Sequence, residues 1–193
     1  MDLYKGDFDS IRNCKHGWGE CKYKNGSYYQ GFWSNDMRHG MGSIEYSNKD
    51  KYTGNFIKNK KEGPGKYFFF SHNYEYNGFW KSNMKFGKGI ETFKDGKYIG
   101  NWIEGKIDGD GYYKMNNGQA FKMFFVKDKP TRKNPIDIKS VDWSKTMDIF
   151  AVDANTNQLA QSDHLLSVPN VEVKKSLHNR GQSEAVNPNE FEE

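Results

Sequence analysis

The chain has 193 residues and a formal net charge of +4, which fits one domain with a short appendage. Aromatic residues make up 16% of it, but aliphatic residues are scarce and the mean hydropathy is −1.00. This composition excludes a thick two-layer core and favours a thin repeat array in which each unit packs on its neighbours. No run of 18 apolar residues and no signal-like hydrophobic region occurs, so we expect a soluble, unsecreted protein.

A unit of two short strands recurs along the first 118 residues, with a period of 22 to 24 residues. In one copy, Tyr29, Gly31 and Trp33 share one side of the first strand, because alternate residues of a strand point the same way. Gly40 and Gly42 share one side of the second strand. A glycine leaves a slot that an aromatic ring from a neighbouring strand can fill. The first-strand copies are Tyr4-x-Gly6-x-Phe8, Tyr29-x-Gly31-x-Trp33, Tyr52-x-Gly54-x-Phe56, Tyr76-x-Gly78-x-Trp80 and Tyr98-x-Gly100-x-Trp102, and the second-strand pairs are Gly17/Gly19, Gly40/Gly42, Gly63/Gly65, Gly87/Gly89 and Gly109/Gly111.

The repeats predict an all-β fold, an elongated single-layer antiparallel array of β-hairpins over residues 1–129. The first turn, between Asp9 and Lys15, holds two extra residues. A sixth unit begins at Phe121 without the glycines and is interpreted as a degenerate cap.

Beyond the array, residues 127–135 (KDKPTRKNP) are interpreted as a charged linker that opens a C-terminal extension over 130–180. A short helix is predicted near 142–152, because Trp143, Met147 and Phe150 fall at helical spacing. A weaker helix is predicted over 158–166, and the acidic end, 181–193, is predicted to be disordered.

Candidate catalytic and metal-binding residues have structural interpretations. His16 and His39 occupy a repeat position that Glu62 holds in the third copy, so a structural role is favoured. Cys21 belongs to the inward series of its strand, which favours a buried free thiol over a disulfide with Cys14. Neither cysteine has the spacing of a zinc site. We therefore predict no enzyme activity, no catalytic residue, no metal site and no cofactor.

The pattern Tyr-x-Gly-x-(Phe/Trp), a short polar turn and then Gly-x-Gly, at a period near 23 residues, resembles the MORN repeat. The resemblance covers about residues 1–118 and implies a twisted, single-layer antiparallel array. It also implies a scaffold or tether, since members include radial-spoke heads, cortical proteins, membrane tethers and binders of motor-protein tails. Some members carry catalytic domains, but the 64 residues after the array are too few for those. The third and fourth copies depart from the usual His-Gly, with Glu62-Gly63 and Phe86-Gly87.

We therefore expect a non-catalytic scaffold that binds a helix or an extended peptide of a partner protein. The face opposite the aromatic series carries apolar residues that a fully solvated face would not need. The resemblance implies a cytoplasmic, cytoskeleton-associated protein of a cilium, flagellum or cell cortex. The residues predicted to contact the partner are Trp18, Phe32, Met41, Phe68, Phe79, Ile99 and Trp143, flanked by Lys66 and Lys88.

The alternative is a peripheral membrane tether. Residues 1–129 carry 22 basic and 15 acidic residues, a balance of +7, and Lys58, Lys60 and Lys61 cluster in one turn. Each lysine near an anionic surface contributes about 1 kcal/mol, so three lysines alone would bind a membrane only weakly. The scaffold is therefore favoured over the tether. Nucleic-acid binding is not expected, because the aromatic residues are placed by the repeat and no basic stripe appears. An open first strand would also allow a homodimer through the array ends.

Overall fold

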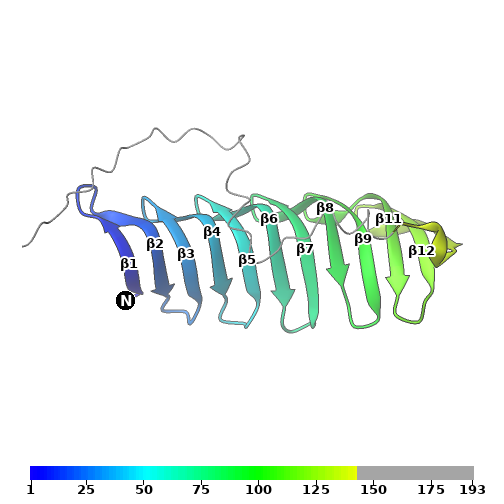
Figure 1. The fold of residues 1–193 in the computed structure, drawn as a ribbon, viewed down its shortest axis with the longest axis horizontal. Helices are drawn as coiled ribbons and strands as arrows, with labels where there is room; N and C mark the ends of the chain where they lie inside the picture. The colour runs from blue at the N-terminus through cyan, green and yellow to red at the C-terminus, as the bar shows by residue number, and fades with distance from the viewer. Residues whose placement is uncertain (143–193) are drawn as a thin grey trace, which may run out of the picture. The chain divides into compact units, whose positions relative to one another are not determined.

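The structure is a computed structural model that describes residues 1–142. They form one open 13-stranded antiparallel sheet in which strands adjacent in sequence are neighbours (Figure 1). The short β10 pairs only with β9, and a 3-10 helix, η1, follows the last strand. The predicted all-β hairpin array is confirmed. The elements are β1 (Leu3–Asp9), β2 (Cys14–Lys22), β3 (Tyr28–Ser34), β4 (Met37–Glu45), β5 (Lys51–Ile57), β6 (Lys60–Phe69), β7 (Tyr74–Lys81), β8 (Met84–Thr92), β9 (Gly96–Ile103), β10 (Lys106–Ile107), β11 (Gly109–Met115), β12 (Ala120–Val126), β13 (Lys129–Ile136) and η1 (Ile138–Ser140).

Glycines hold the register of the sheet. Gly31 on β3 faces Gly19 on β2 and Gly42 on β4, and such pairs recur from Gly6 on β1 to Gly100 on β9. The ring of Tyr29 lies against this backbone, since a Cβ at Gly42 would sit 2.7 Å from its ring carbons. The glycine pairs are therefore required because any side chain would displace the ring.

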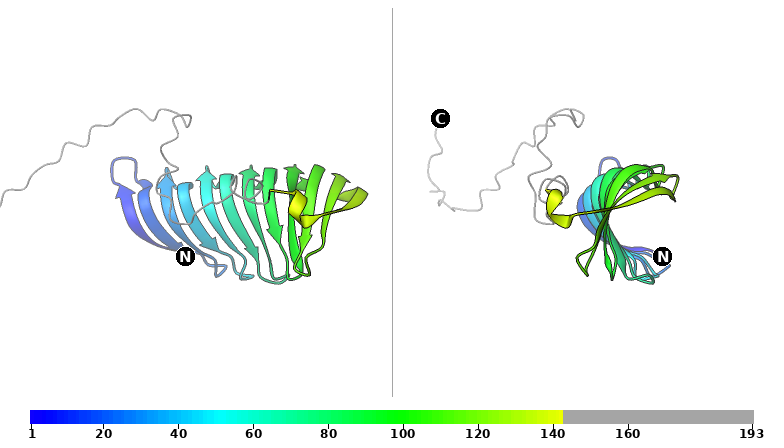
Figure 2. Two further views of the ribbon diagram at one scale, coloured as in Figure 1. Left: turned by 45° about the vertical axis from the view of Figure 1, so that its right-hand side comes forward. Right: turned by 90° about the vertical axis from the view of Figure 1, so that its right-hand side faces the viewer.

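The aromatic residues form the core of this single-layer sheet. Seen along its length, the sheet bends into a trough (Figure 2, right). We call the side of the sheet that buries the aromatic rings the inner face. There Trp33 packs edge to face between Tyr4 and Tyr29, with ring centroids 5.5 Å and 5.1 Å away. The buried rings on this face are Tyr29, Trp33, Tyr52, Phe56, Tyr76, Trp80, Tyr98, Trp102 and Phe125.

From the second repeat on, two-residue turns join the two strands of a repeat and form hydrogen bonds to the repeat before it. In the turn between β5 and β6, Lys58 and Asn59 have φ values of 47° and 68°, as in a type I′ turn. The Asn59 N–H donates to the carbonyl of Arg38 at 3.0 Å, and its Oδ1 accepts from the N–H of Arg38 at 2.9 Å. The turn residues Asp36, Asn83 and Asp128 make the same two bonds, whereas Gly105 makes only the backbone one.

The sheet continues beyond the predicted array boundary at residue 129, so the linker interpretation of 127–135 is wrong. β13 pairs with β12 along its length, with Phe121 opposite Pro135. An edge strand tolerates proline, because one of its sides forms no ladder hydrogen bonds. The predicted helices at 142–152 and 158–166 and the tail at 181–193 lie outside the described residues.

Two smaller predictions are confirmed. β1 ends at Asp9 and β2 begins at Cys14, which leaves the longer first turn that the insertion predicted. Cys14 and Cys21 are buried and free.

Replacing Gly65 by alanine should destabilise the array, since the new Cβ would lie 2.4 Å from the Tyr52 hydroxyl oxygen. We expect a loss of about 1 to 3 kcal/mol of unfolding free energy, measured by chemical denaturation. In a Tyr52→Leu background the loss from Gly65→Ala should be smaller. An equal loss in both backgrounds would show that the ring contact is not the reason.

Gly105→Asn should stabilise the array. An asparagine there can accept from the N–H of Lys85, as Asn59 accepts from Arg38, and the positive φ of 83° suits asparagine. The expected gain is about 1 kcal/mol, seen as a higher midpoint of thermal unfolding. Asn59→Gly should give the opposite shift, and failure of both shifts would contradict a stabilising role for these bonds.

Candidate functional site

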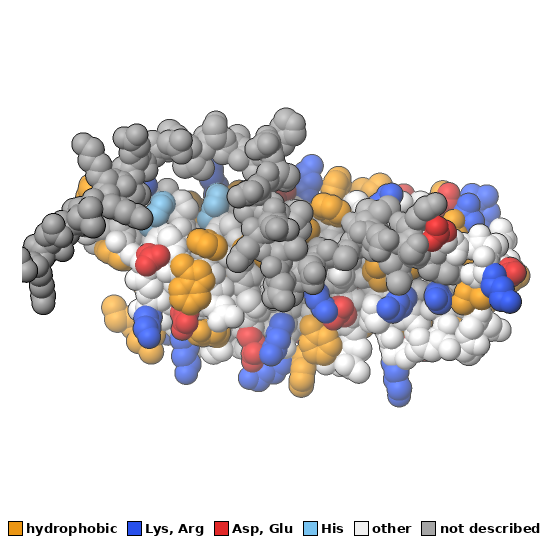
Figure 3. Space-filling view, in the orientation of Figure 1, with side chains coloured by type: hydrophobic (Ala, Val, Ile, Leu, Met, Phe, Trp, Pro, Cys, Tyr) orange, Lys and Arg blue, Asp and Glu red, His pale blue; other side chains and the backbone are white. Residues whose placement is uncertain are grey.

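The outer face, opposite the trough, carries exposed aromatic side chains over the first strands. Trp18 on β2 and Phe32 on β3 are register partners, and their side chains are 45% and 48% exposed. Met41, on the next strand, is partly exposed. We call these three residues the outer aromatic row. Figure 3 shows hydrophobic side chains interspersed with basic and acidic ones on the face toward the viewer.

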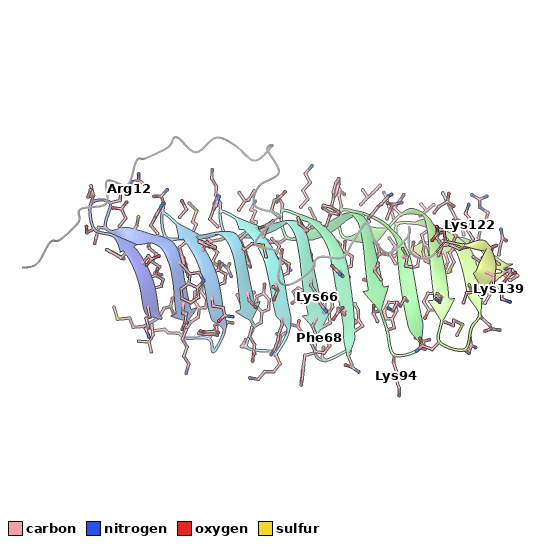
Figure 4. All side chains as sticks on the ribbon, in the orientation of Figure 1. Arg12, Lys66, Phe68, Lys94, Lys122 and Lys139 are labelled. Atoms are coloured by element: carbon pink, nitrogen blue, oxygen red, sulfur yellow. The ribbon has the colours of Figure 1, made fainter. Side chains whose placement is uncertain are left out.

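The other predicted contact residues do not join this row. Phe79 on β7 is exposed, but the strands between it and Met41 separate the two by about 14 Å. Lys66 and Phe68 lie on β6 (Figure 4), where Phe68 is partly exposed. Ile99 is only 4% exposed, so it does not contribute an accessible surface. Lys88 is exposed, and Trp143 lies outside the described residues.

A row of cations covers the inner face and was not predicted from the sequence. Lys15, Arg38, Lys61 and Lys85 hold the same repeat position, two residues before the first glycine, and Ile107 takes it in the fifth repeat. The Lys61 Nζ lies 4.1 Å from the ring centroid of Trp80 and 4.3 Å from that of Tyr67. These contacts are cation–π interactions that close the inner face over the aromatic core. Comparing the residue at this position in successive repeats would have revealed the row from the sequence.

The membrane alternative is affected by this row. Lys58 lies in the turn and Lys60 is exposed, but Lys61 points into the trough. The lysine cluster therefore presents two lysines to a surface instead of three, which removes about a third of an already small electrostatic attraction.

Acidic groups neutralise part of the inner face. Lys85 forms an ion pair with the buried Glu91. Asp50 is also buried and accepts hydrogen bonds from the Tyr67 hydroxyl at 2.9 Å and from the Phe70 N–H at 2.8 Å. These groups serve packing between repeats.

Two shallow hollows open on the inner face. One, of about 520 Å³, is lined by Lys15, Arg38, Trp33 and Tyr46 among others. The other, of about 330 Å³, lies beside Ile107 in the fifth repeat.

Neither face shows the arrangement of a catalytic centre in the part of the chain that the structure describes. Within residues 1–142, no three His, Cys, Asp or Glu side chains gather to hold a metal ion. In the same range, no helix is long and apolar enough to cross a membrane. His16 and His39 are both exposed.

Burial shifts the pKa values of titratable side chains on the inner face. It lowers the pKa of Lys61 to about 8, and the nearby positive charge of Lys85 adds to this effect. The cation–π contacts with the rings favour the charged lysine, so they act against this lowering of the pKa. Burial, together with the charge of Glu91, raises the pKa of Tyr74 to about 12.

Lys61 should make stability depend on pH. Its pKa is about 8 in the folded chain against an ordinary 10.5, so the unfolded chain binds more protons at this site between those values. The destabilisation caused by the charged lysine is therefore full below pH 8 and is relieved as the pH rises toward 10.5. Relative to Lys61→Met, the wild type should gain on the order of 1 to 3 kcal/mol across this window, measured by denaturation at several pH values. Lys60→Met, at an exposed position, is the control, and a flat difference for Lys61→Met would contradict the shift.

Comparison with known proteins identifies the repeats. The family model described as MORN repeat matches residues 29–51, 52–74, 76–97 and 98–120, and no catalytic domain is recognised beside it. No curated protein matches the chain. Among the solved structures, the TCP domain of SAS-4 (dCPAP) of Drosophila melanogaster, in complex with a proline-rich motif of Ana2 (dSTIL), is 16% identical with a TM-score of 0.28, covering 69% of this chain and 88% of that one. A similarity this distant identifies neither fold nor function. The four matched repeats, on the sheet that their glycines and tyrosines build, show that the chain is a MORN-repeat protein.

Proposed function

We propose that this protein is a non-catalytic scaffold that binds partner proteins through the outer aromatic row. The observation that carries the proposal is the pair Trp18 and Phe32, which lie side by side on adjacent strands, each about half exposed. Exposed aromatic residues that adjoin one another mark interaction sites, and aromatic anchors dominate the energy of interfaces.

The packing on the inner side of these strands favours a role in binding, and not in folding, for the outer aromatic row. Gly17, Gly19 and Gly31 lie in the same strand pair, and Tyr4 and Tyr29 pack against its inner side. The backbone under Trp18 and Phe32 is thus fixed by contacts on the other face. A rigid support lowers the entropy cost of binding, because only the partner has to be ordered.

The shape of the surface sets the class of partner. The face is an open sheet without a deep pocket at this row, so it suits a helix with apolar residues on one side or an extended peptide. The exposed lysine at position 22 and the half-buried Glu20 flank the row, and mixed charges at its rim would orient such a segment.

We also propose that the partner belongs to a cytoskeletal, ciliary or cortical assembly and that the protein works in the cytoplasm. The basis is the family resemblance, in which such roles recur. Membrane tethering is less well supported, since Lys58 and Lys60 remain as a pair after Lys61 turns inward.

The proposal is tested with a photo-crosslinking residue at Phe32 in the full chain, incubated with cell extract. We expect one or a few proteins to be captured there and identified by mass spectrometry. With a captured protein made recombinantly, Trp18→Ser combined with Phe32→Ser should weaken binding by about 2 kcal/mol or more, measured by calorimetry.

Phe70→Ser is the matched control, because Phe70 is 57% exposed in the turn after β6 and lies outside the row. It should leave affinity unchanged. Retention of full affinity by the double variant would overturn the proposal. Pelleting with anionic vesicles that is lost on changing Lys58 and Lys60 to glutamate would instead favour the tether.

A further inference from the structure

The aromatic ladder of the inner face is incomplete at β1. In each later repeat, the aromatic residue two positions after the first-strand glycine packs on the tyrosine of the repeat before it. The ring centroids of Trp33 and Tyr4 are 5.5 Å apart, and those of Phe56 and Tyr29 are 5.4 Å apart. Phe8 holds this position in the first repeat and is 53% exposed, whereas the equivalent residues in later repeats are at most 9% exposed. Among the described residues, no ring packs on Phe8 as one packs on its equivalents, which are Trp33, Phe56, Trp80, Trp102 and Phe125.

The two ends of the described sheet differ in how they can accept another strand. Within residues 1–142, β1 has one sheet neighbour, β2, and β13 has one, β12. β13 contains Pro130 and Pro135 and is strongly basic, features that prevent edge pairing. β1, with the sequence LYKGDFD, has no proline, and its one lysine and two aspartates leave only a small net charge. An edge of this kind is a template for a further strand.

The register of the sheet specifies which strand fits. From β1 to β9, every pair of neighbouring strands places a glycine opposite a glycine. A strand added to β1 would keep this line if it placed a glycine opposite Gly6. β1 is itself such a strand.

We propose that two copies of this chain pair antiparallel through β1, about a two-fold axis that passes between Gly6 and Gly6 of the partner subunit. This register places Lys5 opposite Asp7 of the partner subunit, and Tyr4 opposite Phe8 of the partner subunit. Residues directly opposite in an antiparallel pair lie on the same side of the sheet. Both copies therefore turn their inner faces to the same side, and the trough continues from one to the other.

The pairing gives the exposed side chains of β1 partners on the other copy. Phe8 gains an aromatic neighbour, and Lys5 and Asp7, both exposed, gain opposite charges twice, once on each side of the axis. The contact is isologous, so it closes as a dimer and does not extend into a fibre. The outer aromatic row begins one strand away and stays accessible, so this inference does not depend on the proposed function.

The test is sedimentation equilibrium of the full chain. We expect a concentration-dependent dimer for the wild type. Lys5→Glu should weaken it at least tenfold, because both symmetric contacts become repulsive, and Asp7→Lys should do the same. An equimolar mixture of the two variants should recover the wild-type affinity, since each charge then faces an opposite one.

A second variant covers the case in which Asp7→Lys fails to fold, because Asp7 also accepts a hydrogen bond from the Trp18 N–H. Phe8→Glu should give a folded monomer, judged by circular dichroism, while Phe70→Glu should remain dimeric. A wild type that is monomeric at all concentrations would overturn the proposal. So would a dimer that neither Lys5→Glu nor Phe8→Glu weakens.

Discussion

The contact between a tyrosine ring and a bare stretch of backbone supports the rest of the structure. The Tyr52 ring lies against Gly65, where a Cβ would be 2.4 Å from the hydroxyl oxygen. Because the ring lies close to the glycine backbone, Phe56 of the same repeat and Trp80 of the next can pack edge-on against it, with ring centroids 5.1 Å and 5.5 Å away. The rings thus replace the second layer that a sheet normally needs, which explains how a chain poor in aliphatic residues builds a core.

Much of the fold could be predicted, because the glycine and tyrosine positions repeat with the period-two alternation of strands. Two features were missed for physical reasons. Pro130 and Pro135 indicate a linker in most contexts, but an edge strand leaves one side unpaired and accepts them. Lys61 was grouped with Lys58 and Lys60 as a charged turn, although the alternation places it on the same side as Gly63. A run of like charges does not show that neighbouring side chains in a strand point to opposite faces.

The candidate site was predictable only in part. Alternation assigns Trp18, Phe32 and Ile99 to the outer face, but it cannot indicate which of them is covered. In the structure Trp18 and Phe32 are exposed and Ile99 is not. Exposure depends on what packs above a residue, and a repeat pattern carries no information about that. The outer aromatic row is therefore narrower than the surface predicted from the sequence.

The hydrogen bonds from each turn to the repeat before it have a mechanical consequence. Asn59 holds Arg38 and Asn83 holds Lys61, so each repeat is fastened to the next one along the array. A folded repeat advances the array by about 10 Å, two strand spacings. Its 22 to 24 residues, pulled straight, span roughly 75 Å. Under tension between its ends, such an array would release some 65 Å each time one repeat peels away, while the remaining repeats keep their own contacts. A protein of this design can lengthen in steps and still remain attached at both ends.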